Sequence, residues 1–279
     1  MPSTLTMDDL RTVPHDDVLA DAEKRIGRVL DRDHAHYSRF NGTAGFPTSE
    51  GTWVRLAWCR LEQLSSSAWT GIEASVAIRG VPRPEWYGGS QWYDPSRGVV
   101  WRVDEMSRAT ATAVSPVGTV DHKPALPAGW WAELRCALSA LATYTTDRVC
   151  VQQEHLSARI RDVYGDEIDT TVPEWACAHG DVGWANVTAP AFMLLDWESW
   201  GRAPVGYDAA CLWSASLTVP VLAEQVLDEF ADVLHTRAGR LSRLLLCANI
   251  ERAQRRSGSE TPMFAPATAA SMELLSSLA

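Results

Sequence analysis

Apolar residues near the start of the chain recur first at helical and then at strand spacing. Within residues 14–31 the apolar side chains lie three or four positions apart, which predicts an amphipathic helix. Three shorter apolar runs, separated by turns that contain glycine, predict three strands. These runs are residues 37–40, 43–47 and 52–59. Residues 68–79 then have a helical pattern, and residues 99–106 predict a further strand that runs into a linker.

The pattern in the second half of the chain is mostly helical. Four long segments carry apolar residues at helical spacing. They are residues 130–144, 152–164, 220–234 and 236–255. Between them, residues 192–195 form a continuous apolar run, which predicts a buried strand that ends just before Asp196. The predicted fold class is therefore α+β, with a small mainly β part over residues 1–103 and a larger mainly helical part over residues 104–279.

Three oxygen-bearing side chains lie close together in the sequence at the spacing of a phosphoryl-transfer site. Asp181 and Asn186 are five residues apart, which is the interval between the Asp and the Asn of a kinase catalytic loop. Asp196 follows an apolar run, as the metal-binding Asp of kinases does. Asn186 and Asp196 would supply the hard oxygen ligands that Mg²⁺ prefers. Asp181 would orient an acceptor hydroxyl and take its proton.

Residues 179–212 as a whole resemble the aminoglycoside phosphotransferase and choline kinase-like family of small-molecule kinases. The matching pattern is His-Gly-Asp with an Asn five residues after the Asp, an apolar run that ends in Asp-Trp-Glu, and then Gly-Tyr-Asp. The resemblance implies a two-lobed protein kinase-like fold, with a small mainly β N-lobe that covers the nucleotide and a larger mainly helical C-lobe. It also implies the roles of five residues: Asp181 as the catalytic base, Asn186 and Asp196 as metal ligands, His179 as a residue that shapes the loop, and Asp208 as a buried residue that holds the loop backbone.

The expected N-lobe would bind the phosphates of a nucleotide through a fixed positive charge. Kinases carry a Lys on the third strand, and this chain has Arg55 there, whose guanidinium offers a bidentate fork to phosphate oxygens. Its expected partner is Glu73, in the helical stretch that follows. A pair between Arg55 and Glu73 would position the Arg for the nucleotide, and a Glu73 that faces solvent would contradict this. The alternative is that Arg55 is an exposed side chain on an edge strand.

The phosphate loop and the hinge have weaker sequence signatures. The chain has no G-x-G-x-x-G pattern in this region, so a phosphate cradle would depend on the turn at residues 41–45. Kinases bind the adenine edge with main-chain groups that follow the last N-lobe strand. The candidates for this contact are Arg102, Val103, Asp104 and Glu105. An ordinary strand and turn is the alternative, and main-chain contacts do not distinguish ATP from GTP.

Composition and charge narrow the classes of partner. The 279 residues carry a net charge of -10 and a pI near 5.2, which argues against nucleic acid and is compatible with an amine-bearing substrate. The six cysteines are scattered without a C-x-x-C pair, so neither a zinc site nor a disulfide framework is expected. Because no signal segment and no membrane-spanning apolar run is visible, we expect a cytoplasmic protein without a membrane partner.

Three functions from different classes fit these observations. The first is a Mg²⁺-dependent kinase that transfers the γ-phosphoryl group of ATP or GTP to a hydroxyl of a small molecule, such as an aminoglycoside or another amine-bearing antibiotic. The second is a nucleotide-binding relative without transfer activity, which the absence of a glycine loop and the presence of Arg55 keep open. The third is a metal-dependent phosphohydrolase that uses His179, Asp181 and Asp196. The presence of Asp181, Asn186 and Asp196 together favours the kinase.

Overall fold

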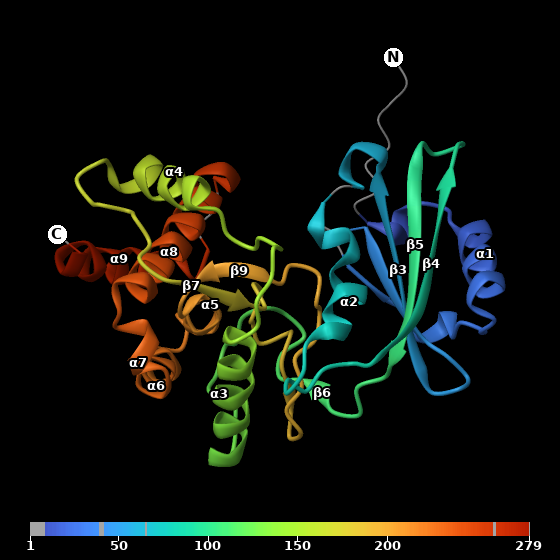
Figure 1. The fold of residues 1–279 in the computed structure, drawn as a ribbon, viewed down its shortest axis with the longest axis horizontal. Helices are drawn as coiled ribbons and strands as arrows, with labels where there is room; N and C mark the ends of the chain where they lie inside the picture. Colours follow the sequence, from blue (N-terminus) through green and yellow to red (C-terminus); the bar gives the residue numbers. More distant parts are fainter. Residues whose placement is uncertain (1–8, 39–41, 65, 259–260, 279) are drawn as a thin grey trace. The chain divides into compact units, whose positions relative to one another are not determined.

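The structure is a computed structural model that describes residues 9–38, 42–64, 66–258 and 261–278 (Figure 1). Its contacts divide the chain into two compact units. One consists of Met1–Ala77 and Pro84–Thr110, and the other of Ile78–Arg83 and Ala111–Ala279. The first unit contains a five-stranded sheet and the second contains the long helices that follow it, which confirms the predicted α+β class. The division falls after Thr110 rather than after Val103, because the strand that contains Val103 continues to Ser107.

The sheet of the first unit is antiparallel, with the strand order β1-β2-β3-β5-β4. Its strands are β1 (His36–Tyr37), β2 (Thr43–Pro47), β3 (Thr52–Arg60), β4 (Trp86–Asp94) and β5 (Val99–Ser107). Strands β2 and β3 confirm two predicted strands, whereas the third prediction includes residues 39 and 40, which lie outside the described part of the chain. Strand β4 was not predicted. Its two central glycines, Gly88 and Gly89, weaken a strand signal, and pairing with β5 overrides this preference.

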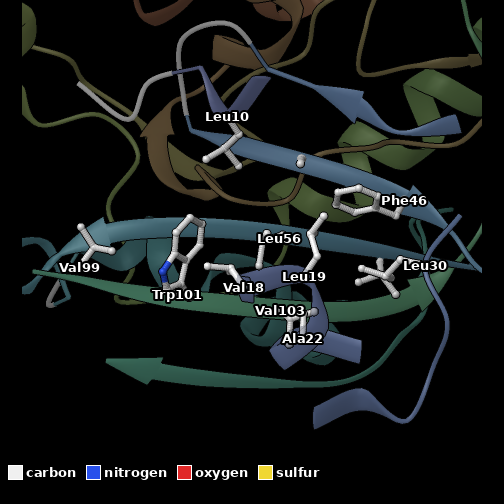
Figure 2. Close-up of a cluster of buried hydrophobic side chains, with 12 residues drawn as sticks. Leu10, Val18, Leu19, Ala22, Leu30, Phe46, Leu56, Val99, Trp101 and Val103 are labelled. Carbon is white, nitrogen blue, oxygen red and sulfur yellow. The ribbon is translucent and has the colours of Figure 1, made fainter. Parts of the chain in front are cut away.

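One face of this sheet is covered by the helix α1 (Asp16–Ile26) and contains the hydrophobic core of the unit. Figure 2 shows Val18 and Leu19 of the helix beside Leu56 and Val103 of the sheet, and all four are at most 3% exposed. The apolar spacing that predicted the helix is therefore its buried side. The helix is shorter than predicted because Gly27 adopts a left-handed conformation with φ of 68° and ends it.

A short helical segment follows β3 in place of the predicted helix over residues 68–79. It consists of the 3₁₀ turn Ser67–Thr70, the helix α2 (Gly71–Ala74) and the 3₁₀ turn Ser75–Ala77. Thr70 and Gly71 are poor helix formers, and the regular α-helix spans only four residues. The segment nevertheless brings Glu73 to the sheet, where its carboxylate meets a side chain of β5.

The second unit is mainly helical, as predicted. Its helices are α3 (Ala128–Ala142), α4 (Gln153–Tyr164), α5 (Tyr207–Ala215), α6 (Pro220–Glu229), α7 (Ala231–Leu234), α8 (Arg237–Ser257) and α9 (Phe264–Leu278). The predicted helix over residues 220–234 is interrupted at Phe230, which has a non-helical φ of -124°. Helix α9 was not predicted. Within the described residues, no helix combines the length and the apolar character that a membrane span requires.

Two small sheets connect these helices. Strand β7 (Trp175–Ala178) pairs with β9 (Gly201–Pro204), and β6 (Thr112–Ala113) pairs with β8 (Thr188–Ala189). The predicted strand over residues 192–195 is wrong, because this segment forms only an isolated bridge between Leu194 and Val187. Phe192 and Leu194 are buried, so the apolar pattern reflects burial of an irregular segment and not a regular ladder.

Candidate active site

The loop that begins at His179 is held by a buried carboxylate. Strand β7 leads directly into this loop, and Asp208 lies in the first turn of α5. Its two carboxylate oxygens accept hydrogen bonds from the main-chain N–H groups of His179 and Gly180, at 2.7 and 2.8 Å. Burial raises the pKa of Asp208, and the two N–H donors and His179 act in the opposite direction. Asp208 lies 29 residues after His179 in the sequence, and folding brings the two together.

His179 connects this loop to the segment that contains Asp196. Its side chain is fully buried, and Nε2 lies 2.8 Å from the main-chain oxygen of Leu195, so Nε2–H donates to that carbonyl. The imidazole also packs edge-to-face on Trp197, with ring centroids 4.8 Å apart. The remaining nitrogen, Nδ1, is buried without a partner among the described residues. His179 is therefore in no position to bind a metal ion at the surface, which argues against the phosphohydrolase.

Asp181 and Asn186 are joined by two hydrogen bonds within the loop. The amide nitrogen Nδ2 of Asn186 donates to Asp181 twice, to Oδ2 at 2.9 Å and to the main-chain oxygen at 2.8 Å. This contact fixes which end of the amide faces the carboxylate, and leaves the amide oxygen on the other side. Desolvation and the charge of Asp196 raise the pKa of Asp181, against the smaller effects of His179 and Asn186.

Asp196 stands on a strained turn next to these residues. It is the only non-glycine residue in the described part of the chain with a positive φ, 60°. Such a conformation is uncommon outside glycine, although Asp tolerates it better than most residues, and it is typical of functional sites. Asp196 is exposed, and the main-chain N–H of Leu195 beside it donates to the main-chain oxygen of Asn186 at 2.8 Å, so Asn186 and Asp196 lie on neighbouring segments.

The oxygen atoms in this arrangement suit a small divalent cation. The carboxylate of Asp196 and the amide oxygen of Asn186 are hard ligands, and two protein ligands are typical for Mg²⁺ shared with phosphate groups. Within the described ranges, no group of three His, Cys, Asp or Glu side chains forms a self-sufficient metal site. The donor set therefore fits an ion that arrives with a nucleotide better than an ion held permanently by the protein.

The first unit contains an ion-pair cluster on the sheet face opposite α1, in which Arg102 and Asp104 are buried and Glu73 is exposed. Arg102 donates through Nε and Nη2 to the two carboxylate oxygens of Asp104, both at 2.7 Å, and Nη2 also reaches Glu73 at 3.1 Å. Trp86 donates its indole N–H to Asp104 at 2.9 Å. The partner of Glu73 is therefore Arg102, and the predicted pair between Glu73 and Arg55 is wrong. The sequence contained no signal for this, because the choice between two arginines depends on strand register.

Arg55 nevertheless lies on the same face of the sheet as this cluster. It is directly opposite Asp104 in the pairing of β3 with β5, and directly opposite Gly45 in the pairing of β2 with β3. Residues that pair across an antiparallel sheet project from the same side. Of the turn at residues 41–45, position 41 lies outside the described residues, whereas Thr43 to Gly45 belong to β2.

The predicted hinge residues lie inside a central strand, which corrects their interpretation as a linker. Residues 102–105 pair with β3 on one side and with β4 on the other. Their main-chain groups face neighbouring strands on both sides and are not offered to a nucleotide base. Their side chains have structural contacts as well: Val103 is in the core, and Glu105 accepts hydrogen bonds from Arg28 at 2.8 Å and Thr52 at 2.9 Å. The prediction placed the end of this strand too early.

Comparison with known proteins identifies the fold. No family model and no curated protein matches the chain. Among solved structures, the aminoglycoside phosphotransferase APH(4)-Ia is similar with a TM-score of 0.57 and 10% identity, over 95% of this chain and 100% of that chain. A ternary complex of a thermostable mutant of that enzyme with ADP and hygromycin B gives a TM-score of 0.52 and 12% identity, over 94% and 98% of the two chains. The GDP complex of wild-type aminoglycoside 2'-phosphotransferase-IIIa gives 0.53 and 11%, over 84% and 89%. This likeness confirms the kinase-like fold that the sequence resemblance implied.

Proposed function

We propose that this chain is a small-molecule kinase, which transfers the γ-phosphoryl group of a nucleoside triphosphate to a hydroxyl group. The observation that carries the proposal is the hydrogen-bonded pair of Asp181 and Asn186, on a loop whose backbone is held by Asp208 and which is hydrogen-bonded to Leu195, the residue before Asp196. A phosphoryl-transfer enzyme mainly supplies position and charge compensation, and these residues supply both. The fold shared with aminoglycoside phosphotransferases agrees with this proposal.

In the reaction, the bond between the γ-phosphorus and the bridging oxygen breaks, and a new bond forms between phosphorus and the acceptor oxygen. The nucleoside diphosphate leaves, and Asp181 accepts the proton of the acceptor hydroxyl. Its raised pKa makes the carboxylate a stronger base than an ordinary Asp. Asn186 keeps the carboxylate in one orientation through its hydrogen bond at 2.9 Å.

Asn186 and Asp196 would hold Mg²⁺ between them and the phosphates. When bound, this ion offsets the negative charge of the phosphate oxygens. The strained backbone at Asp196 and the bond of His179 to Leu195 keep the carboxylate at a fixed place. We expect that Asp196→Ala weakens the binding of Mg²⁺ and nucleotide together, with a smaller effect on binding of the acceptor.

The nucleotide would contact the sheet face that carries Arg55. We retain Arg55 as the proposed phosphate-binding residue, because it shares this face with the Arg102 cluster, although Glu73 does not position it. Contacts with the base would come from the chain after Ser107, where β5 ends and the main chain is no longer paired within the sheet. Both ATP and GTP remain candidates: similar structures contain ADP in one case and GDP in another.

The acceptor is expected to be an aminoglycoside or another amine-bearing antibiotic. The net charge of -10 is compatible with a cationic molecule, and hygromycin B is bound in one of the similar structures. A cytoplasmic location and the absence of nucleic-acid and membrane partners stay predictions from the sequence.

A transfer screen tests the proposal. Mg²⁺ with ATP or GTP is incubated with a panel of hydroxylated amines and aminoglycosides, and phosphorylated products are detected by mass spectrometry. We expect a product with at least one acceptor, and a loss of about 10²- to 10⁴-fold in rate for Asp181→Asn, the range for removal of a general base. Asp232→Asn, an exposed acid on α7, is the matched control and should retain full activity. Transfer at the normal rate by Asp181→Asn would refute the assignment of the base.

A nucleotide-binding protein without transfer activity is the second candidate. It is favoured by one observation, that Glu73 pairs with Arg102 and not with Arg55. A thermal-shift measurement with Mg²⁺ and each nucleotide separates the two. A clear rise in Tm without product from any acceptor supports the binding module, whereas a rise together with product supports the kinase.

A further inference from the structure

A four-residue segment contacts both parts of the candidate site, namely the loop that carries Asp181 and the segment that follows Asp196. This segment, residues 148–151, lies between α3 and α4 and is called the strap here. It runs beside β9, where the main-chain N–H of Arg202 donates to the oxygen of Arg148 at 2.8 Å. The oxygen of Arg202 accepts in turn from the N–H groups of Cys150 and Val151, both at 3.0 Å. The strap is therefore held rigidly by its backbone.

The side chain of Arg148 fixes the chain that follows Asp196. Its Nε donates to the main-chain oxygen of Trp200 and its Nη2 to that of Glu198, both at 3.1 Å. The guanidinium also lies over the Trp200 ring, 4.5 Å from the centroid. Arginine is suited to this task because its donors form a planar fork, whereas a lysine ammonium is a compact charge on a flexible stem. The segment after Asp196 is thus held at two carbonyl groups by one side chain.

The strap also touches the loop that carries Asp181. A Cβ atom built on Gly180 would lie 2.5 Å from the sulfur of Cys150 and 3.0 Å from the main-chain oxygen of Ser199. Gly180 therefore packs between the strap and the chain after Asp196, and its φ of 89° excludes most other residues. Gly201 is equally close, because its Cβ would lie 2.8 Å from the nitrogen of Cys150.

We propose that Arg148 and Cys150 are positioning residues, which fix the spacing between the carboxylates of Asp181 and Asp196. Arg148 holds the segment that follows Asp196. Cys150 packs against Gly180, the residue before Asp181. The inference rests on the proposed kinase function, in which Asp181 takes the proton and Asp196 would hold the metal ion beside it. No sequence motif marks the strap, and only the folded chain brings it to the site.

The substitution Arg148→Lys keeps the charge but removes the fork. We expect the segment after Asp196 to shift, and kcat to fall by about 10- to 100-fold, as expected for a misplacement of about 1 Å in an active site. The Mg²⁺ concentration that gives half the maximal rate should rise, and KM for the acceptor should change little. Amide hydrogen exchange in residues 197–200 should accelerate, because the carbonyl groups of Glu198 and Trp200 lose the planar fork that holds them.

Arg243→Lys is a matched control. The guanidinium of Arg243 also lies 4.5 Å from the centroid of a tryptophan ring, that of Trp213, and the side chain is buried between α5 and α8. This variant tests the loss of a similar buried contact away from the strap. Its Mg²⁺ dependence and the amide exchange of residues 197–200 should equal those of the original protein.

Amide hydrogen exchange followed by NMR measures how firmly residues 197–200 are held without any need for activity. Faster exchange there in Arg148→Lys, together with the shift in Mg²⁺ dependence, supports the proposal. Unchanged exchange and an unchanged Mg²⁺ dependence in a folded Arg148→Lys variant would overturn it. If Arg148→Lys does not fold, Cys150→Leu, which presses on Gly180, and its isosteric control Cys150→Ser replace it, with exchange at Gly180 and Asp181 as the readout and the same two outcomes. Faster exchange in a protein that transfers no phosphate would support the strap and refute the kinase.

Discussion

The substitution Asp208→Asn tests how the loop with the candidate base is held. In the structure, two buried N–H groups each have one carboxylate oxygen as their acceptor, at 2.7 and 2.8 Å. An asparagine has one acceptor oxygen, so one of these N–H groups faces an NH₂ group and loses its partner. A buried donor without an acceptor costs about 1–3 kcal/mol. The change also removes a buried charge, whose cost is visible in the raised pKa of Asp208, so we expect the lower half of this range, about 1–2 kcal/mol.

The assay combines unfolding with amide hydrogen exchange. A loss of about 1–2 kcal/mol should lower Tm by several degrees in a chain of this size. Exchange at the amides of His179 and Gly180 should accelerate more than exchange elsewhere, because the loop opens locally. Phosphoryl transfer should fall by about 10- to 100-fold, since Asp181 is then less precisely placed.

The control for a general loss of stability is Leu274→Ala. Leu274 is a buried residue of α9, 3% exposed, and its truncation should cost about 2–5 kcal/mol. This variant should melt at a lower temperature but keep the amides of the loop protected and the transfer rate normal below its Tm. If Asp208→Asn leaves the exchange of His179 and Gly180 unchanged, the reasoning about the anchor is refuted.

Three further predictions follow from the described contacts. Asp181→Asn should raise Tm at pH 7, and this gain should vanish below pH 3.8. The reason is that a pKa raised in the folded state lowers stability only at a pH where the group is ionised. A gain in Tm that persists in acid would contradict this. Gly201→Ala should lose about 1–3 kcal/mol in chemical denaturation, because its Cβ meets main-chain atoms at 2.8–2.9 Å, whereas Gly129→Ala, with open space around it in α3, should gain about 0.4–1 kcal/mol. Arg102→Met should lower the free energy of unfolding by about 3–5 kcal/mol, because it leaves the charge of the fully buried Asp104 without its ion-pair partner. A second change, Asp104→Leu, should recover most of that loss. No recovery would show that the pair itself stabilises the unit.

The candidate site residues of the second unit could be named from the sequence because they form a motif. Asp181 and Asn186 have the spacing of a kinase catalytic loop and Asp196 follows an apolar run, so these three positions carry the information. Helical periods likewise predicted α3, α4 and α8 to within two residues at each end. The apolar run before Asp196 was misread, because burial alone makes a segment apolar and does not require a strand.

The contacts in the first unit depended on strand register, which the sequence does not contain. Arg55 and Arg102 both lie on the face that meets Glu73, and the pairing of β3 with β5 decides which of them reaches it. The end of β5 was equally hidden, since the strand continues for as long as its neighbours can pair with it. Register is set by contacts between distant strands, and a one-residue shift would reverse every side chain.

The sequence by itself determined the α+β class, the loop with its three oxygen-bearing residues, and the kinase-like fold implied by its resemblance. The tertiary structure decided how that loop is held: by Asp208 from α5, by the imidazole of His179, and by the strap with Arg148. Reactive groups are constrained by chemistry to particular residue types at short spacing, and so they leave a motif. Supporting groups need only the right atom at the right place, which many residues on distant segments can supply, and only folding brings them together.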